Sequence, residues 1–113
     1  MPKLLLAEDD PTMVSLLSTL LKMEGFDVVV AGANADVPAA VKEEKPDFML
    51  MDVHIGKQNG LDLLQAIRQD PTNAHVRIVM ASGYNVKEEC LAGGANHFLL
   101  KPFMPDDLLK LLK

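Results

Sequence analysis

The segment from Phe48 to Asp52 constrains the fold of this chain more than any other stretch. Its four apolar residues follow the chain-breaking pair Pro46-Asp47 and precede a segment that contains glycine. A run of this length with these flanks is typical of a β-strand covered on both faces. The strand ends on a carboxylate, which is costly to bury unless it is solvated, paired or bound to a metal. Because ligands bind at the carboxyl ends of the strands in open α/β sheets, Asp52 is the first candidate for chemistry.

Strand and helix patterns alternate along the chain. We expect strands at Leu4–Ala7, Phe26–Ala31, Phe48–Asp52, Val76–Ala81 and His97–Leu100. We expect helices from Asp10 to Gly25, from Asn34 or Asp36 to about Lys45, from Gly60 to Asp70, over Val86–Ala92 and from Pro105 onward, with a loop from Val53 to Asn59. Asp10 is a candidate N-cap, and Gly25 stands where a left-handed C-cap is expected. This alternation predicts one α/β domain, in which a doubly wound parallel sheet lies between two layers of about five helices.

The helices differ in how deeply we expect them to pack. The second expected helix is rich in Ala, Lys and Glu, which predicts shallow packing, and Cys90 is expected to be half-buried on the fourth. In the last helix, we expect Leu109 to be exposed, while three others pack on the sheet: Leu108, Leu111 and Leu112. The alternative is that the helix over 86–92, the strand over 97–100 and this last helix form a face that docks a partner or a second copy.

Composition excludes several classes of function. A chain of 113 residues can form one ordinary domain, and its formal charge of −5 argues against direct binding of nucleic acid. No apolar run approaches the length needed to span a membrane, and no signal peptide is expected at the N-terminus. A single cysteine, Cys90, cannot form an internal disulfide, which fits a cytoplasmic location. The three histidines show no spacing typical of a zinc site.

Polar residues follow four of the five expected strands. They are Glu8, Asp9 and Asp10 after the first, Asp52 ending the third, Ser82 after the fourth and Lys101 after the fifth. Clustered carboxylates repel one another and need a divalent cation, for which Mg²⁺ is suited. A lysine and a hydroxyl nearby suit an anion such as a phosphoryl group, and a carboxylate can act as a nucleophile toward phosphorus. The pattern therefore indicates a metal-assisted phosphoryl acceptor.

Motifs in this order resemble those of the receiver domain of two-component response regulators. The matching pieces are Glu8-Asp9, Asp52, Asn59-Gly60, Ala81-Ser82-Gly83, Gly93-Gly94-Ala95 and Lys101-Pro102-Phe103. The resemblance covers residues 1–113 as a single receiver domain. It implies the flavodoxin-like fold of the chemotaxis regulators, with strand order 2-1-3-4-5.

The resemblance also implies roles for the residues of the acidic cluster. Asp52 would accept a phosphoryl group from a phosphohistidine on a sensor histidine kinase or phosphotransfer protein. Asp9 and Asp52 would bind Mg²⁺ directly, together with the backbone carbonyl of His54, and Glu8 would act through water. The chain would catalyse only its own phosphoryl transfer and dephosphorylation, and is therefore not expected to be a classical enzyme.

Other matched positions imply a switch. Ser82 would bond a phosphoryl oxygen, and Lys101 would pair with the phosphoryl group, with a cis peptide bond before Pro102. Phe98 occupies the position of the aromatic switch residue, although simple core packing also explains an aromatic residue there. His54 and Tyr84 occupy positions that tune the phosphoryl lifetime, and an exposed loop side chain is an alternative for His54. Gly56 stands where the family often has Pro, which predicts a more flexible loop.

Two further functions remain as alternatives. The chain could be a receiver-like module that acts through protein contacts without phosphorylation, although no acceptor, metal or lysine position is missing. A phosphohydrolase of the haloacid dehalogenase type is disfavoured, because His54 stands where such enzymes have a second Asp. Phosphorylation would shift the conformational population of the face formed by residues 86–92, residues 97–100 and the last helix. The favoured conformation would bind a downstream output domain or protein, or a second copy of the chain.

Overall fold

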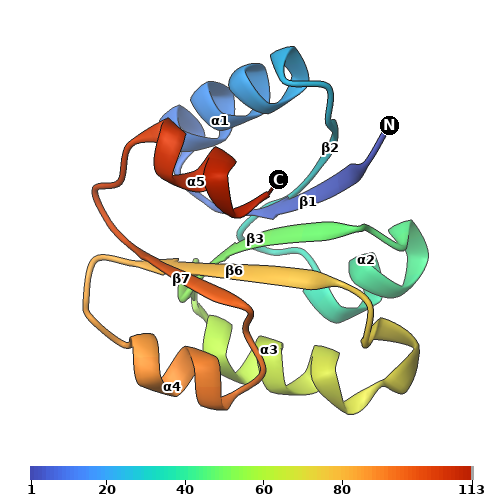
Figure 1. The fold of residues 1–113 in the computed structure, drawn as a ribbon. Coiled ribbons are helices and arrows are strands. Elements are labelled where there is room, and N and C mark those ends of the chain that lie inside the picture. Colours follow the sequence, from blue (N-terminus) through green and yellow to red (C-terminus); the bar gives the residue numbers. More distant parts are fainter. Residues whose placement is uncertain (113) are drawn as a thin grey trace.

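The structure, a computed structural model, describes residues 1–112 and is built on a five-stranded parallel sheet (Figure 1). The strands lie in the order β2-β1-β3-β6-β7. Their bounds are β1 (Lys3–Ala7), β2 (Asp27–Ala31), β3 (Phe48–Asp52), β6 (Arg77–Ser82) and β7 (His97–Leu100). This is the predicted order 2-1-3-4-5, so the expected fold class is confirmed. β3 lies at the centre of the sheet, between β1 and β6.

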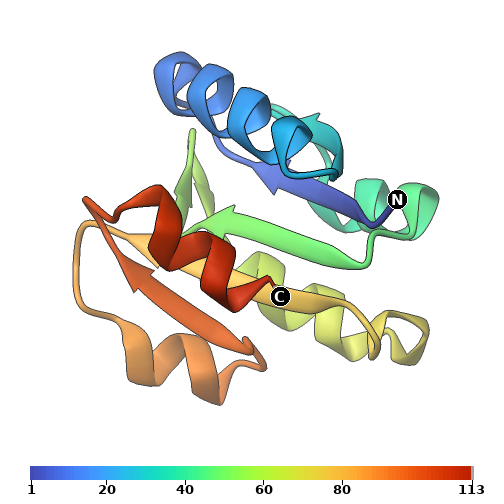
Figure 2. The same ribbon diagram turned by 45° about the horizontal axis from the view of Figure 1, so that its top comes forward.

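Helices cover both faces of the sheet. They are α1 (Pro11–Met23), α2 (Val37–Glu44), α3 (Gly60–Gln69), α4 (Lys87–Ala92) and α5 (Pro105–Leu111), with a short 3-10 helix, η1 (Pro71–Asn73). Figures 1 and 2 show α1 and α5 on one face and the other three α-helices on the opposite face. Within residues 1–112, none of the helices has the length and apolar composition to cross a membrane.

Alternate residues of the strands pack into two separate cores. On β3, Leu50 joins the core beneath α1 and α5, while Met49 and Met51 join the core beneath α2, α3 and α4. All three side chains are buried, because both faces of the strand are covered. This arrangement explains why an unbroken apolar run, without alternation, predicted the central strand correctly.

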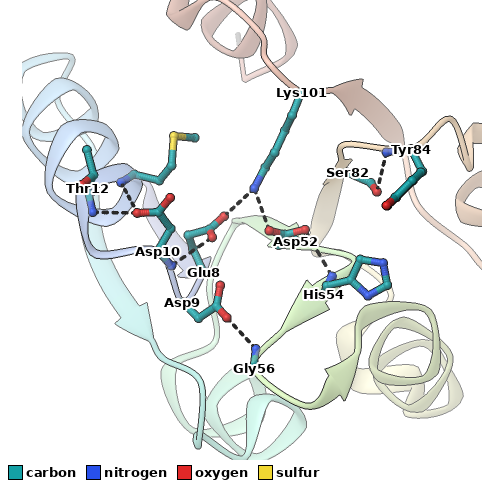
Figure 3. A network of polar contacts seen from close by, with 11 residues as sticks. Glu8, Asp9, Asp10, Thr12, Asp52, His54, Gly56, Ser82, Tyr84 and Lys101 are labelled. Carbon is teal, nitrogen blue, oxygen red and sulfur yellow. Dashed lines mark hydrogen bonds and ion pairs between the residues drawn. The ribbon is translucent and has the colours of Figure 1, made fainter.

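Local capping defines the ends of α1 as the sequence predicted. The carboxylate of Asp10 accepts hydrogen bonds from the backbone N–H groups of Thr12 (2.9 Å) and Met13 (3.4 Å). The helix ends at Met23, and Gly25 adopts a left-handed φ of +93°. Because Asp10 serves as this cap, its side chain points along the helix start and not into the neighbouring acidic cluster (Figure 3).

The segment from 53 to 59 is more ordered than the predicted loop. Two short strands, β4 (His54–Ile55) and β5 (Gln58–Asn59), pair in an antiparallel hairpin beyond the carboxyl end of β3 (Figure 2). Gly56 occupies the first central position of the two-residue turn with φ +57°, a position at which glycine is favoured in hairpins. Strands of two residues contain too few side chains to give a periodic pattern, which is why the sequence did not predict them.

Three expectations about burial were wrong. Leu109 is buried together with Leu108 and Leu112, because these residues join the same core as α1, whereas Leu111 is only partly buried. Cys90 is fully buried, and not half-buried, on the sheet-facing side of α4. The helix predicted to pack shallowly, α2, buries two valines completely, Val37 and Val41.

Arg68 links three segments on the α3 side of the sheet, and the sequence did not predict this role. Its guanidinium donates to the backbone carbonyls of Gly94 (2.9 Å), Asn73 (2.9 Å) and Val76 (2.7 Å) and to the side chain of Asn96 (3.1 Å). Burial lowers the pKa of Arg68 below its usual value. The side chain therefore ties the end of α3 to the segments that lead into β6 and β7.

Candidate functional site

Four strand ends converge at the carboxyl edge of the sheet (Figure 3). Glu8 and Asp9 follow β1, and Asp52 is the last residue of β3. One carboxylate oxygen from each of these three residues lies within 4.8 Å of the others. The adjacency of β1 and β3 in a parallel sheet brings these carboxylates together, as the sequence predicted.

Lys101, which follows β7, reaches into this acidic cluster. Its Nζ lies 2.6 Å from Asp52 Oδ2 and 3.1 Å from Glu8 Oε2. Burial alone would lower the pKa of Lys101, but the bonds to Asp52 and Glu8 outweigh this effect and raise its pKa above the usual value. The backbone N–H of Lys101 donates to the carbonyl of Ser82 at 2.8 Å, and the predicted cis peptide bond before Pro102 is present. Lys101 is thus held as an ammonium between two carboxylates.

Glu8 is the most buried of the acidic residues in the cluster, with only 4% of its surface exposed. Burial raises the pKa of Glu8, and the hydrogen bonds from the backbone of Asp10 (3.2 Å) and from Lys101 only partly offset this rise. The negative charge of Asp52 raises the pKa of Glu8 further. The single ammonium of Lys101 therefore leaves Glu8 in an unfavourable environment for its charged form.

The donor set of the cluster fits a hard divalent cation. Each of the three residues offers a carboxylate oxygen, and Mg²⁺ prefers such ligands together with retained water. Backbone N–H groups orient two of the carboxylates: His54 donates to Asp52 Oδ1 at 3.2 Å, and Gly56 donates to Asp9 Oδ2 at 2.7 Å. Mutual repulsion among three carboxylates gives a further reason for a cation to bind there.

The remaining predicted residues lie around this cluster at different depths. Ser82 is buried at the end of β6, and its Oγ accepts a hydrogen bond from the backbone of Tyr84 at 3.1 Å. The rings of His54, on β4, and Tyr84, in the loop after β6, meet edge to face with centroids 6.4 Å apart, beside Asp52 and Ser82 (Figure 3). Phe98, on β7, is partly buried against the core beneath α3 and α4. The structure thus places Ser82, His54 and Tyr84 around Asp52 and Phe98 farther along the sheet.

Sequence reasoning missed two contacts of this site. It assigned Glu8 a role toward Mg²⁺ through water, and it did not predict that Glu8 also pairs with Lys101. It regarded Gly56 as a source of flexibility, whereas the backbone of Gly56 is bonded to Asp9. A glycine that begins a two-residue turn indicates a left-handed backbone, but nothing local in the sequence identifies Asp9 as its partner.

The fold and the site together define a class of protein. A doubly wound sheet with three carboxylates and a lysine at its carboxyl edge is the arrangement of a receiver domain of two-component signalling. Family comparison agrees, because the pattern of the response regulator receiver domain matches residues 4–113. The chain belongs to this family.

Individual relatives show the same relationship. The chain is 33% identical over 110 residues to the DNA-binding response regulator MtrA of Mycolicibacterium smegmatis, a match that covers 95% of this chain and 47% of MtrA. It therefore spans about half the length of the curated relatives it matches.

Solved structures extend the comparison to complete receiver folds. The chemotaxis response regulator CheY4 of Vibrio cholerae superposes with a TM-score of 0.89 at 28% identity, over 99% of this chain and 96% of that one. The beryllofluoride-activated receiver domain of Klebsiella pneumoniae RstA superposes with a TM-score of 0.86 at 27% identity, over 97% and 94% of the two chains.

Proposed function

We propose that this chain is a phosphorylation-switched signalling domain in which Asp52 accepts the phosphoryl group. One observation carries the proposal: Asp52 ends the central strand with one oxygen 2.6 Å from Lys101, inside a cluster whose carboxylates suit a divalent cation. A nucleophilic carboxylate needs neighbours that neutralise the charge of the incoming phosphoryl group. This site offers two, the ammonium of Lys101 and carboxylates that suit a divalent cation. The phosphoryl donor is a phosphohistidine on a sensor histidine kinase or a phosphotransfer protein.

In the transfer step, an oxygen of Asp52 attacks phosphorus and forms the acyl phosphate bond. The bond from phosphorus to the histidine nitrogen breaks, and that nitrogen keeps the electron pair and takes up a proton. Asp9, Asp52 and the backbone carbonyl of His54 would hold Mg²⁺, and Glu8 would act through water. When bound, Mg²⁺ neutralises negative charge on the phosphoryl oxygens and on the clustered carboxylates.

Lys101 has two partners before phosphorylation, and the transfer changes which charge it pairs with. Its ammonium lies between Asp52 and Glu8, within hydrogen-bond distance of both. Once Asp52 is phosphorylated, Lys101 pairs with the phosphoryl oxygens, since they then carry the negative charge. Ser82, at the end of β6, exchanges its bond from the Tyr84 backbone for one to a phosphoryl oxygen.

The change at Ser82 biases the surface formed by α4, β7 and α5, which we call the output face. Phe98 lies on β7 within this face and turns inward as Ser82 moves. The face exposes apolar side chains, including Leu91 (40%) and Leu100 (49%), which suit a protein partner. Its partner is a downstream output domain or protein, or a second copy of this chain.

The side chains of His54 and Tyr84 tune the lifetime of the phosphoryl group without contributing to its transfer. Their edge-to-face contact bridges the loops on either side of the acceptor. A ring pair in this position controls whether hydrolytic water reaches the phosphorus. Single substitutions of either residue should change the dephosphorylation rate, and the double substitution should differ from the sum because the rings touch.

The test of this proposal is intact mass after incubation with acetyl phosphate and Mg²⁺. The expected result is one added phosphoryl group that is labile in alkali, absent in Asp52→Asn and absent when the metal is chelated. If no adduct forms and beryllofluoride with Mg²⁺ also fails to bind, the domain acts through protein contacts without phosphorylation. Beryllofluoride is a suitable probe, because the related RstA receiver was crystallised in a beryllofluoride-activated form.

A further inference from the structure

The turn of the β4–β5 hairpin makes a direct contact with the acidic cluster. The backbone N–H of Gly56 donates to Oδ2 of Asp9 at 2.7 Å, across 47 residues of sequence (Figure 3). Hydrogen bonds from N–H groups to charged carboxylates are short and stronger than those between neutral groups. Because the side chain of Asp9 is exposed, this bond restricts a carboxylate that would otherwise sample several rotamers.

The donor itself is held rigidly. On the hairpin, Ile55 is completely buried, and the side chain of Gln58 donates to the backbone carbonyls of Ala33 (2.9 Å) and Ala35 (3.0 Å). These contacts anchor both strands of the hairpin without involving Asp9. The N–H of Gly56 is therefore presented to the acidic cluster by an anchored turn.

Glycine is the residue best suited to this presentation. Gly56 has φ +57°, a conformation that residues with a Cβ rarely adopt and that proline cannot adopt. A Cβ at this position would lie 3.0 Å from the Cβ of Ala33 and 3.1 Å from its carbonyl oxygen. The donor, the conformation and the close packing all depend on the same residue.

We propose that Gly56 is a positioning residue for cation binding: its N–H fixes Asp9 in the orientation in which a carboxylate oxygen of Asp9 lies within 4.8 Å of carboxylate oxygens of Glu8 and Asp52. The inference rests on the proposed function, since it assigns Asp9 to the cation site. Groups that orient a metal ligand through a hydrogen bond typically change metal affinity by about 10–100-fold. Linkage makes the effect reciprocal, so cation binding in turn stabilises the hairpin turn.

Isothermal titration calorimetry with Mg²⁺ alone tests the proposal on the whole chain. Gly56→Pro removes the donor and should weaken Mg²⁺ binding by about 10–100-fold. Gly56→Asn keeps the N–H and tolerates a left-handed backbone, so it should lose much less affinity than Gly56→Pro. Gly32→Ala is the matched control, because its Cβ would meet no atom within 4 Å and its φ is not left-handed, and its affinity should be unchanged.

Equal affinity of the wild type and Gly56→Pro would overturn the proposal. An equal loss in Gly56→Pro and Gly56→Asn would also overturn it, because the donor would then not be responsible. Failure of the wild type itself to bind Mg²⁺ would instead remove the proposed function.

A measurement without metal distinguishes failure of this proposal from failure of the proposed function. Amide hydrogen exchange of Gly56, followed by NMR in the metal-free protein, should accelerate by about tenfold or more in Asp9→Ala if the N–H is bonded to Asp9. Unchanged exchange in this variant would refute the contact whether or not Mg²⁺ binds. In the wild type, saturating Mg²⁺ should slow the same exchange, and the absence of this slowing would contradict the reciprocal coupling.

Discussion

Replacing Lys101 with Met tests how much the lysine ammonium contributes to the stability of the acidic cluster. The substitution keeps a long apolar stem but removes the ammonium between Glu8 and Asp52. No other lysine or arginine within residues 1–112 forms an ion pair with these two carboxylates. The variant therefore leaves the acidic cluster without its neutralising partner, and we expect the fold to lose stability when no metal is present.

The size of this loss follows from burial. Removing one partner of a fully buried ion pair costs about 3–5 kcal/mol, whereas exposed pairs contribute about 1 kcal/mol or less. The side chains of Lys101, Asp52 and Glu8 are 24%, 11% and 5% exposed, which places this cluster between the two limits. We expect a loss of about 2–3 kcal/mol in the free energy of unfolding.

Urea unfolding followed by circular dichroism measures this loss without adding ionic strength. With slopes of about 1–3 kcal/mol/M for small domains, the midpoint of Lys101→Met should fall by about 0.7–3 M in the presence of a chelator. Because the folded-state pKa of Lys101 is raised, its contribution is present at neutral pH and disappears only as strongly alkaline pH removes the proton from the folded state. Saturating Mg²⁺ should reduce the difference in urea midpoint between the variant and the wild type, since a bound cation replaces part of the missing positive charge.

Lys3→Met is the matched control. Lys3 also contacts a carboxylate, that of Glu44, but at 3.3 Å and with about a third of each side chain exposed (31% and 33%). Its removal should cost about 1 kcal/mol or less. Two results would contradict this explanation of the charges in the cluster. One is that Lys101→Met is no more destabilising than Lys3→Met, and the other is that Mg²⁺ does not reduce the difference in midpoint between Lys101→Met and the wild type.

Three further predictions concern buried or partly buried groups. Because burial raises the pKa of Glu8, its ionised form opposes folding at neutral pH. Glu8→Gln should therefore raise the urea midpoint in the presence of a chelator and weaken Mg²⁺ binding. A lower midpoint in this variant would contradict the prediction. Arg68→Ala removes four hydrogen bonds and should cost about 2–4 kcal/mol, with Arg68→Lys recovering less than half of the loss; a loss below about 1 kcal/mol would argue against the network. Burial first, and then the charge of Glu89, raises the pKa of the Cys90 thiol, so its reaction with a disulfide reagent should follow unfolding, and rapid reaction of the native protein would refute this.

The sheet and its central acidic residues were predictable because their signals are local. The apolar run from Met49 to Met51 predicts a strand covered on both faces, and the alternation of strands and helices predicts a parallel sheet. Once the strands are parallel, their carboxyl ends meet at one edge. The proximity of Glu8, Asp9 and Asp52 could therefore be predicted without knowing how any individual side chain is oriented.

The contacts that were missed join residues far apart in the chain. The bond from Gly56 to Asp9 and the pair between Lys101 and Glu8 depend on how a hairpin and a lysine side chain settle after the sheet has formed. Arg68 bonds mainly to backbone carbonyls, which every residue possesses, so no sequence pattern marks its partners. The burial of Leu109 depends on the core that α5 shares with α1, which the spacing within α5 alone does not reveal.

The identity of the phosphorylated residue is the most direct test of the account. Reduction of the acyl phosphate with borohydride converts the modified aspartate to homoserine, which tandem mass spectrometry can locate after proteolysis. We predict homoserine at position 52 after treatment with acetyl phosphate and Mg²⁺, and none when beryllofluoride is bound first. Homoserine at Asp9 or Asp10 in place of Asp52, or a phosphoryl adduct that yields no homoserine at position 52, would contradict it.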